Sequence, residues 1–346
     1  MSAAVSIIIP ARDEAANLGA CLSAAAVSSA AEIVVVDDDS SDGTAQLVQS
    51  WAARHARIRM LRLGPLESDP ECAGWAGKNR ACWRGAQLAS RPWLLFLDAD
   101  ARLMPGGLER ALAWAQRDDL AALSLSPRQD CDSWAEAAVV PVVFTLLDRC
   151  YRHGPGGGPD GNSPAAANGQ FFLFRRDAYF ALGGHAAVAG WWLEDVALAR
   201  RLQAAGLPFA LLPGDGLVRA RMYRDLWSLW RGWSKNAVPL FGPPLAWPPG
   251  PAARALAAPW LCAAAWALGT VARVGWLAGL GAVGLAACHA DYARRLPRGQ
   301  RRYTPWLLPG SALYIAIWCD GARLQRQGRL QWKGRPAPAV GGDNSL

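Results

Sequence analysis

Apolar and polar positions alternate in blocks over the first half of the chain, and these blocks predict strands and helices in alternation. Short runs rich in β-branched and aromatic residues are typical of buried strands; they are Val5–Ile9, Glu32–Val36, Ile58–Leu63, Trp93–Leu97 and Gln170–Phe174. We expect Pro10 to end the first strand. Stretches rich in alanine or amphipathic in pattern predict helices over residues 17–30, 44–55, 79–89, 107–117, 134–151 and 194–205.

The predicted strands are apolar along nearly their whole length, which indicates a mostly parallel sheet with helices on both faces. The fold class that follows is α/β. In such sheets, ligands bind beyond the carboxyl ends of the strands. Acidic clusters follow two of the predicted strands, at residues 37–39 and 98–100, so we expect both clusters to lie at the ligand-binding edge.

The hydrophobic pattern changes after residue 250. Residues 255–272 contain no charge and are long enough to span a membrane, and residues 274–288 form a second apolar stretch. A third, residues 304–319, is weakened by Pro305, Pro309 and Gly310. Basic clusters follow the second and third stretches, so the positive-inside rule favours a two-span hairpin at about 255–289 with the third segment interfacial or re-entrant. A soluble Ala-rich helical domain is the alternative.

Composition supports a membrane rather than a nucleic-acid partner. Of the 346 residues, 52% are hydrophobic and 18% charged, and the formal net charge is +8. The basic residues flank apolar segments, and no nucleic-acid-binding motif accompanies them. The eight scattered cysteines predict reduced thiols rather than a disulfide framework or zinc site, and the first ten residues do not resemble a signal peptide. The helix predicted at 134–151 also has a pattern compatible with a membrane interface.

Two carboxylates, Asp98 and Asp100, end the apolar run at residues 93–97. Their spacing places both on the same side of an extended backbone. Hard oxygen ligands at a strand end suit Mg²⁺ or Mn²⁺, and such an ion commonly also binds phosphates. A solvated strand end is the structural alternative.

The second cluster, Asp37 to Asp39, needs cations or N–H donors to offset the mutual repulsion of its carboxylates. A nucleobase N–H or a ribose hydroxyl is also a suitable donor. Asp42, further along, is well placed to cap the helix that begins near Thr44.

Five short motifs in order resemble those of family 2 glycosyltransferases. They are Ile-Ile-Ile-Pro-Ala-Arg-Asp-Glu at 7–14, Val-Val-Val-Asp-Asp-Asp-Ser-Ser-Asp-Gly-Thr at 34–44, Gly-Lys-Asn at 77–79, Leu-Asp-Ala-Asp at 97–100 and Trp-Leu-Glu-Asp at 192–195. The resemblance covers about residues 4–240. It implies a GT-A fold, a nucleotide-sugar donor, a divalent metal (Mg²⁺ or Mn²⁺) and inversion at the anomeric carbon. We therefore expect a glycosyltransferase domain at 1–240 and a membrane-associated helical region with a basic tail at 241–346.

The resemblance also implies roles for individual residues. Asp100 is expected to ligate the metal, and Asp98 to reach the ribose or support the metal. The family usually has Asn where this chain has Asp13. The expected donor-binding residues are Pro10, Asp13 and Glu14 at the nucleobase, Asp38 at the uracil or ribose, Lys78 at the nucleotide or its diphosphate, Asp98, and Gly169 near the donor sugar.

The expected catalytic residues are Asp195 and its neighbour Glu194. Inverting transfer requires a carboxylate that removes the proton of the acceptor hydroxyl, and Asp195 stands at the predicted start of a helix, where the helix dipole favours a carboxylate. Both acids could instead only cap that helix. His185 is the one histidine near these motifs, and we place it on the acceptor side or in a structural role.

The chain lacks the Gln-x-x-Arg-Trp motif of processive relatives, which argues against polysaccharide synthesis. In its place, Trp227, Trp230 and Trp233 recur every three residues beside basic side chains. This pattern predicts either an interfacial helix or a buried aromatic stripe. Arg231 and Trp233 are candidates for the diphosphate or acceptor side.

The whole layout resembles a bacterial subgroup linked to hopanoid and carotenoid glycosylation. The prediction is an inverting hexosyltransferase that moves a sugar from a nucleotide-sugar, with UDP favoured, to a hydroxyl of a lipid or terpenoid. It would act at the cell inner membrane with its catalytic domain in the cytoplasm. The alternatives are a polyprenyl-phosphate sugar transferase and a nucleotide-sugar-binding or nucleotidyltransferase-like protein.

Overall fold

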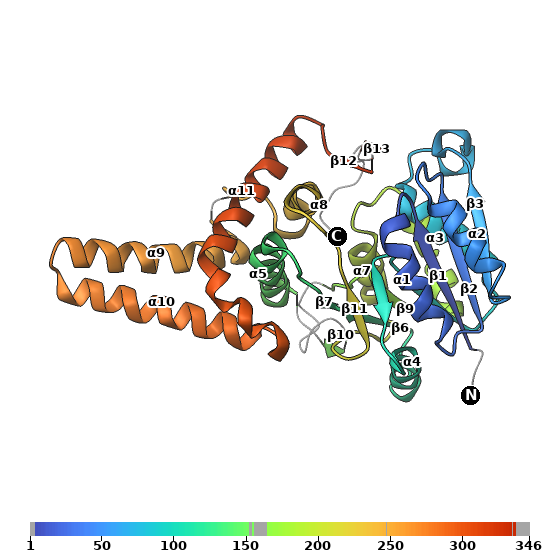
Figure 1. The fold of residues 1–346 in the computed structure, drawn as a ribbon, viewed down its shortest axis with the longest axis horizontal. Helices are drawn as coiled ribbons and strands as arrows, with labels where there is room; N and C mark the ends of the chain where they lie inside the picture. Colours follow the sequence, from blue (N-terminus) through green and yellow to red (C-terminus); the bar gives the residue numbers. More distant parts are fainter. Residues whose placement is uncertain (1–3, 152–153, 156–164, 247, 334, 337–346) are drawn as a thin grey trace. The chain divides into compact units, whose positions relative to one another are not determined.

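The computed structural model describes residues 4–151, 154–155, 165–246, 248–333 and 335–336 (Figure 1). The chain forms two compact units, and each contains segments from distant parts of the sequence. Unit 1 comprises residues 1–129, 151–221 and 333–346, and unit 2 comprises residues 130–150 and 222–332. The last residues of the chain therefore belong to the same unit as the first.

Unit 1 is built on an eight-stranded, mostly parallel sheet with the order β3-β2-β1-β4-β9-β6-β10-β8. Strand β9 runs antiparallel to both its neighbours, β4 and β6. The strands are β1 (Val5–Ala11), β2 (Glu32–Asp38), β3 (Ile58–Leu63), β4 (Trp93–Leu97), β6 (Ala122–Ser126), β8 (Gly154–Pro155), β9 (Phe171–Arg175) and β10 (Phe209–Pro213). The expected α/β class is confirmed, and the reversal of β9 was not visible in its apolar pattern.

Helices cover both faces of this sheet. Successive residues of a strand point to opposite sides, so strands that are apolar along their whole length have apolar side chains to bury on each face. Ile7 and Ile9 of β1 pack in one buried cluster with Leu18 and Leu22 of α1, while Ile8 packs in a second cluster with residues of α3 and α7. The helices of this unit are α1 (Ala15–Ala26), α2 (Thr44–Ala52), α3 (Gly77–Leu88), α4 (Gly107–Arg117), α6 (Arg176–Ala181) and α7 (Glu194–Ala204). Both faces being buried explains why the strands read as continuous apolar runs.

Shorter elements complete unit 1. A second sheet has the order β5-β11-β7 and consists of β5 (Ala101–Leu103), β7 (Arg128–Gln129) and β11 (Val218–Ala220). Short 3₁₀ helices are η1 (Leu66–Ser68), η2 (Pro70–Cys72) and η3 (Gly184–Val188). The last described residues form β13 (Arg335–Pro336).

The first strand continues through Pro10, so the expectation that Pro10 ends it is wrong. Pro10 is level with Val36 of β2, whereas β4 pairs with β1 only from Val5 to Ile8. At Pro10 the strand is therefore paired on one side, and the missing N–H of proline leaves no β4 carbonyl without its donor.

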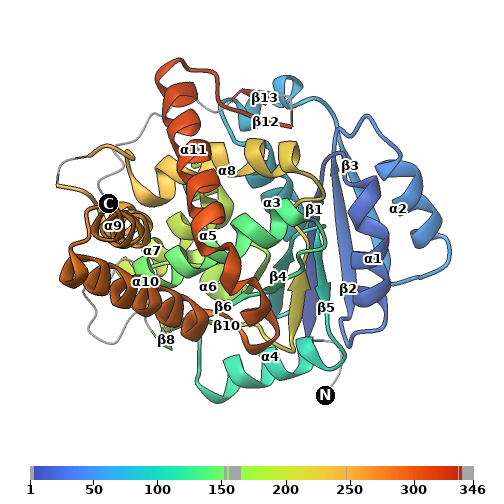
Figure 2. The ribbon, with the colours of Figure 1, turned by 60° about the vertical axis from the view of Figure 1, so that its left-hand side comes forward.

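Unit 2 is helical (Figure 2). Its buried core is rich in aromatic rings. Tyr314 and Trp318 of α11 are fully buried and contact Phe241, while Tyr314 also packs edge-on against Trp233. Its elements are α5 (Trp134–Cys150), α8 (Leu226–Phe241), α9 (Pro251–Val271), α10 (Gly275–Arg295), η4 (Arg298–Trp306), α11 (Leu307–Arg326) and β12 (Gln331–Trp332).

Helix α5 belongs to this core, contrary to the interpretation that it could lie in a membrane interface. Its apolar residues from Ala135 to Val143 are buried, and the helix continues through Pro141. Gly310 of α11 lies so close to it that an added Cβ would meet the Ala138 carbonyl oxygen at 2.0 Å. The apolar pattern of α5 is thus explained by packing between helices.

Helices α9 and α10 form an antiparallel hairpin with closely approaching backbones (Figure 1). A Cβ on Gly281 would meet the Trp266 nitrogen at 2.2 Å, so glycine is required at that contact. Large apolar side chains on the hairpin are exposed, among them Leu261, Trp266, Val271, Trp276, Leu280 and Val283. Among the described residues, α9 is the one helix long and apolar enough to cross a membrane.

Candidate functional site

The candidate site lies in unit 1, where β1, β2 and β4 end at one edge of the sheet. The loop after β1 supplies residues 12–14, β2 ends in residues 37–39, and β4 leads into residues 98–100. The starts of α3 and α7 and the residues before β9 meet the same edge, because Gly169 lies within contact distance of Lys78, Glu194 and Asp195. Segments from six parts of the sequence therefore converge here.

Lys78 is the central cation of this site. Its Nζ lies 2.9 Å from Asp98 Oδ1 and 2.7 Å from Glu194 Oε1, and thus joins the end of β4 to the start of α7. Burial alone would lower the pKa of Lys78, but the two carboxylates outweigh it and raise this pKa well above its usual range. Lys78 is therefore charged, and it also lowers the pKa of the buried Glu194 despite the opposing effect of burial.

Asp195 is held in a fixed orientation by the backbone. Its Oδ2 accepts a hydrogen bond from Gly169 N–H at 2.8 Å, and its Oδ1 accepts one from Val196 N–H at 2.8 Å. Burial and the neighbouring Glu194 raise the pKa of Asp195 to about 7, although Lys78 and these N–H groups act in the opposite direction. A carboxylate with a pKa near neutrality and a fixed orientation is suited to accept a proton.

Asp100 carries an incompletely compensated negative charge. The hydrogen-bond donor described for its carboxylate is Gln170 Nε2, 3.3 Å from each oxygen. Burial, Asp98 and Glu14 raise the pKa of Asp100 to about 7. A divalent cation would relieve this repulsion, and its preference for hard oxygen ligands fits Asp100 and Asp98. No cluster of three or more potential metal ligands occurs among the described residues, so phosphate oxygens or water would complete the coordination.

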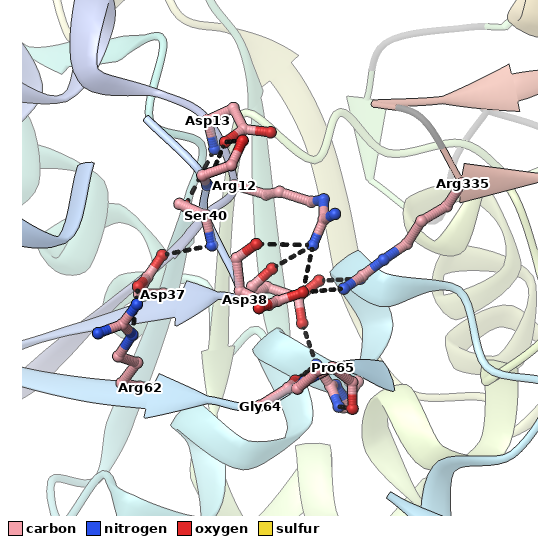
Figure 3. A network of polar contacts seen from close by, with 12 residues as sticks. Arg12, Asp13, Asp37, Asp38, Ser40, Arg62, Gly64, Pro65 and Arg335 are labelled. Carbon is pink, nitrogen blue, oxygen red and sulfur yellow. Dashed lines mark hydrogen bonds and ion pairs between the residues drawn. The ribbon is translucent and has the colours of Figure 1, made fainter. Parts of the chain in front are cut away.

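The carboxylates at the end of β2 are paired with arginines instead (Figure 3). Asp38 is 1% exposed; its Oδ1 bonds Arg80 and its Oδ2 lies 2.5 Å from Arg335 Nη1. Arg80 is also buried and donates to the Gly64 carbonyl at 2.7 Å. Arg12 donates to the main-chain carbonyls of Asp38 and Asp39 at 2.6 and 3.0 Å. The expected repulsion within this cluster is therefore offset by fixed cations.

The family model of glycosyl transferase family 2 matches residues 6–179, which is half of the chain. This chain belongs to glycosyltransferase family 2. The matched region begins in β1 and ends in α6, so it contains Asp38, Lys78, Asp98, Asp100 and Gly169. Glu194 and Asp195 lie beyond it and are connected to it through Lys78 and Gly169.

Two further similarities agree with this assignment. The enzyme is 26% identical over 236 residues to a 4,4'-diaponeurosporenoate glycosyltransferase of Staphylococcus haemolyticus, a match that covers 67% of this chain and 60% of that relative's length. A mannosyltransferase of Pyrobaculum calidifontis, solved with GDP-mannose and Mn²⁺, superposes with a TM-score of 0.56 at 21% identity and covers 93% of this chain and 88% of its own. The fold is thus GT-A.

A weaker likeness extends to a bacterial enzyme solved with a different donor. Residues 1–349 of Staphylococcus aureus TarS, in complex with UDP-GlcNAc, match with a TM-score of 0.44 at 14% identity, covering 95% of this chain and 93% of that one.

Asp13 and Glu14, two of the residues expected at the nucleobase, have different partners in the structure. The Asp13 carboxylate accepts from Ser41 N–H at 2.7 Å and Asp42 N–H at 3.3 Å, so it links the loops after β1 and β2. Glu14 pairs with Lys333. Asp42 accepts from Thr44 N–H at 2.8 Å, but the residue at the N-cap position of α2 is Gly43 rather than the expected Asp42. The donor contacts of Pro10, Asp13 and Glu14 stay predictions.

Sequence reasoning did not single out several polar residues of this site. Asn79 donates from Nδ2 to the carbonyls of Val188, Ala189 and Trp191 at 2.8, 2.9 and 3.0 Å, and so ties the start of α3 to the segment before α7. Arg80, Gln170 and Arg335 were also missed. Asn79 is the last residue of the quoted motif Gly-Lys-Asn, and Arg80 follows it. Two polar residues on a helix with a buried face were the available signal.

His185 is outside the cluster around Lys78, and Arg231 and Trp233 belong to unit 2. The His185 ring is buried, its Nδ1 lies 2.8 Å from the Tyr179 hydroxyl, and burial lowers its pKa to about 3. This environment is that of a structural histidine. On α8 of unit 2, Trp233 is 2% exposed whereas Trp227 is 69% exposed. The three tryptophans therefore do not share one environment, and the acceptor-side role of Arg231 and Trp233 stays a prediction.

Proposed function

We propose that this glycosyltransferase moves one sugar, with inversion, from a nucleotide-sugar to a hydroxyl of a lipid or terpenoid acceptor. The favoured donor is a UDP-sugar, and the reaction takes place at the cytoplasmic face of the inner membrane. The observation that carries the proposal is the geometry of Asp195, a partly buried carboxylate with a pKa of about 7, fixed by Gly169 beside the Lys78 cluster.

The proposed reaction is a single displacement. The acceptor oxygen forms a bond to the anomeric carbon as the bond from that carbon to the diphosphate breaks, and the hydroxyl proton passes to Asp195 Oδ. Lys78 holds Asp98 and Glu194 in place and adds positive charge where the diphosphate leaves. When bound at Asp100 and Asp98, Mg²⁺ or Mn²⁺ would offset the charge on the leaving group.

Exposed apolar surface supports the membrane part of the proposal. The α9–α10 hairpin exposes tryptophan, leucine and valine side chains, and contiguous apolar surface of this kind marks an interaction with a membrane or a partner. Arg294, in the last turn of α10, has a side chain that is 72% exposed and is suited to anionic lipid headgroups. The relative from Staphylococcus haemolyticus is named for an apolar carotenoid acid, which favours a terpenoid-type acceptor.

The test is an assay of the full chain in lipid nanodiscs with Mn²⁺, a panel of UDP- and GDP-sugars, and total membrane lipid as acceptor. We expect release of the nucleoside diphosphate together with a glycosylated lipid detected by mass spectrometry. Asp195→Asn should retain donor binding and lower turnover by about 10³-fold, because the general base is lost.

The matched control is Asp118→Asn, which removes an exposed carboxylate on α4's C-terminal side and should leave turnover unchanged. Full activity of Asp195→Asn would remove Asp195 from its role. It would favour transfer to a polyprenyl phosphate, whose acceptor oxygen needs no base. Release of pyrophosphate would instead favour nucleotidyl transfer.

A further inference from the structure

Two basic residues at the end of the described chain, Lys333 and Arg335, lie on the carboxylates expected to bind the nucleoside. We call this pair the C-terminal strap. Its partners, Glu14 and Asp38, stand about three hundred positions earlier in the sequence and belong to the same unit. The strap therefore returns to the loops that follow β1 and β2.

Arg335 covers Asp38. Its Nη1 lies 2.5 Å from Asp38 Oδ2, its Nη2 lies 3.7 Å from Asp39 Oδ2, and its side chain is 11% exposed (Figure 3). The other oxygen of Asp38 is bonded to Arg80. With 1% of Asp38 exposed, a ligand reaches this carboxylate only after one of the two arginines moves.

Arg335 is the arginine that is free to leave without disturbing the core. Arg80 is 1% exposed, belongs to α3 and also donates to the carbonyls of Gly64 and Pro65 at 2.7 and 3.3 Å. Displacing Arg80 would leave one oxygen of the buried Asp38 carboxylate and these two carbonyls without the hydrogen bonds that Arg80 donates. Displacing Arg335 returns a guanidinium at the end of the chain to water.

The protein is shaped to receive the strap. A Cβ on Gly77 would lie 2.4 Å from Arg335 Nη1 and 2.6 Å from Asp38 Oδ2, so glycine at the start of α3 leaves room for this ion pair. Lys333 pairs with Glu14, and its Nζ donates to the Arg12 carbonyl at 2.5 Å and the Asp13 carbonyl at 3.3 Å. Lys333 has a φ of 46°, a conformation that a non-glycine residue maintains when its contacts compensate the strain.

We propose that the C-terminal strap is a removable cover of the donor site, and that the nucleoside of the donor displaces Arg335 from Asp38. This inference rests on the proposed function in assigning Asp38 to the nucleoside. Donor binding then opens the strap. The apparent donor affinity is reduced in proportion to the fraction of molecules in which the strap is open.

The first experiment measures UDP and GDP affinity of the full chain by tryptophan fluorescence. Arg335→Gln and Lys333→Gln should bind the preferred nucleotide about five- to tenfold more tightly than the wild type, as expected when a cover closed in most molecules is removed. The matched control is Arg329→Gln, whose charge lies outside the strap and whose affinity should equal that of the wild type. Unchanged or weaker binding by Arg335→Gln would overturn the proposal.

The second experiment uses the unaltered protein, so it does not depend on the folding of a variant. Trypsin cleaves after Lys333, and mass spectrometry of the released C-terminal peptide reports how often the strap is open. Saturating UDP or GDP should accelerate this cleavage; equal or slower cleavage at saturation contradicts displacement of the strap.

Asp38→Asn separates the strap from the underlying site. If this variant binds nucleotide as well as the wild type, the assignment of Asp38 to the nucleoside fails, and the proposed function loses that residue. If Asp38→Asn binds more weakly while Arg335→Gln is unchanged, the donor site stands and the strap proposal alone fails.

Discussion

Two aspartate clusters, at the ends of the strands on either side of β1, differ in how their negative charge is compensated. At the end of β2, Asp38 is bonded by Arg80 and Arg335 and is almost fully buried. At the end of β4, Lys78 is shared by Asp98 and Glu194, and the pKa values of Asp100 and Asp195 are raised to about 7. The first cluster is neutralised within the protein, whereas the second retains a demand for positive charge and protons.

This difference suits the cluster after β2 to ligand binding and the cluster around Lys78 to the chemical step. A carboxylate already paired with arginine can recognise a ligand by exchange of partners, as proposed for Asp38. A carboxylate with a raised pKa can take up a cation or a proton, as proposed for Asp100 and Asp195.

Lys78→Met should lower kcat/KM by about 10²- to 10³-fold, since it removes the cation proposed to lie beside the leaving group. Lys78 also lowers the pKa of Asp195, so the pH–rate profile of the remaining activity should shift to higher pH. Steady-state kinetics from pH 6 to 9 measure both effects. Lys78→Arg keeps the charge and is the control; a loss equal to that of Lys78→Met would assign Lys78 a purely geometric role.

Asp38→Asn and Asp100→Asn should change the free energy of unfolding in opposite directions. The first leaves the buried Arg80 without its carboxylate and should cost about 3 kcal/mol. Asp100 has a folded pKa of about 7, above the unfolded value near 4, so its ionised form is disfavoured by folding. Its replacement by Asn should therefore stabilise the metal-free protein at pH 8, by at most about 4 kcal/mol.

Urea unfolding at pH 8 and pH 5, followed by tryptophan fluorescence with EDTA present, measures this pair. The gain from Asp100→Asn should shrink at pH 5, where Asp100 is already protonated in the folded protein. Destabilisation of equal size by both variants would contradict the contrast between the clusters.

The pH dependence of the wild-type enzyme should show the protonation of Asp195. Because its pKa is raised to about 7, the base is protonated below that value and ionised above it. We expect kcat/KM to rise about tenfold from pH 6 to pH 8, a limit set by a single ionisation with this pKa. A flat profile over this range would exclude a base of this pKa from the rate-limiting step.

Mn²⁺ should raise the melting temperature of the wild type by a few degrees, since a ligand that binds only the folded state stabilises it. Asp100→Asn should lose this response, while Asp118→Asn, with its exposed carboxylate, should retain it. Differential scanning fluorimetry with and without EDTA gives the comparison. An undiminished shift in Asp100→Asn would place the cation elsewhere.

Much of the fold could be predicted because buried strands have a clear local pattern. The strand at Trp93–Leu97 was predicted with its observed bounds, and β1, β2 and β3 were located correctly. The direction of β9 could not be predicted, since an apolar strand reads the same in a parallel or an antiparallel pairing. The strands β6 and β10 were not predicted at all. The burial of α5 also depended on neighbours distant in sequence.

The carboxylates near the candidate site could be predicted, but their counter-charges could not. Asp98, Asp100 and Asp195 stand in short motifs, and the structure brings the segments that carry them together around Lys78. The partners of Asp38 depend on tertiary structure, because Arg80 reaches it from α3 and Arg335 from the end of the chain. The raised pKa values follow from burial, which no local pattern specifies.

The hydrogen bonds of Asn79 imply that the candidate site assembles late in folding. Its amide bonds carbonyls at residues 188–191, more than one hundred positions later, and so fixes the start of α3 beside the segment leading into α7. Contacts between such distant segments form late, because a long loop must first be closed. Lys78 can thus meet Glu194 only in a chain whose unit 1 is nearly complete. A chain that lacks its later segments would therefore lack the contact between Lys78 and Glu194.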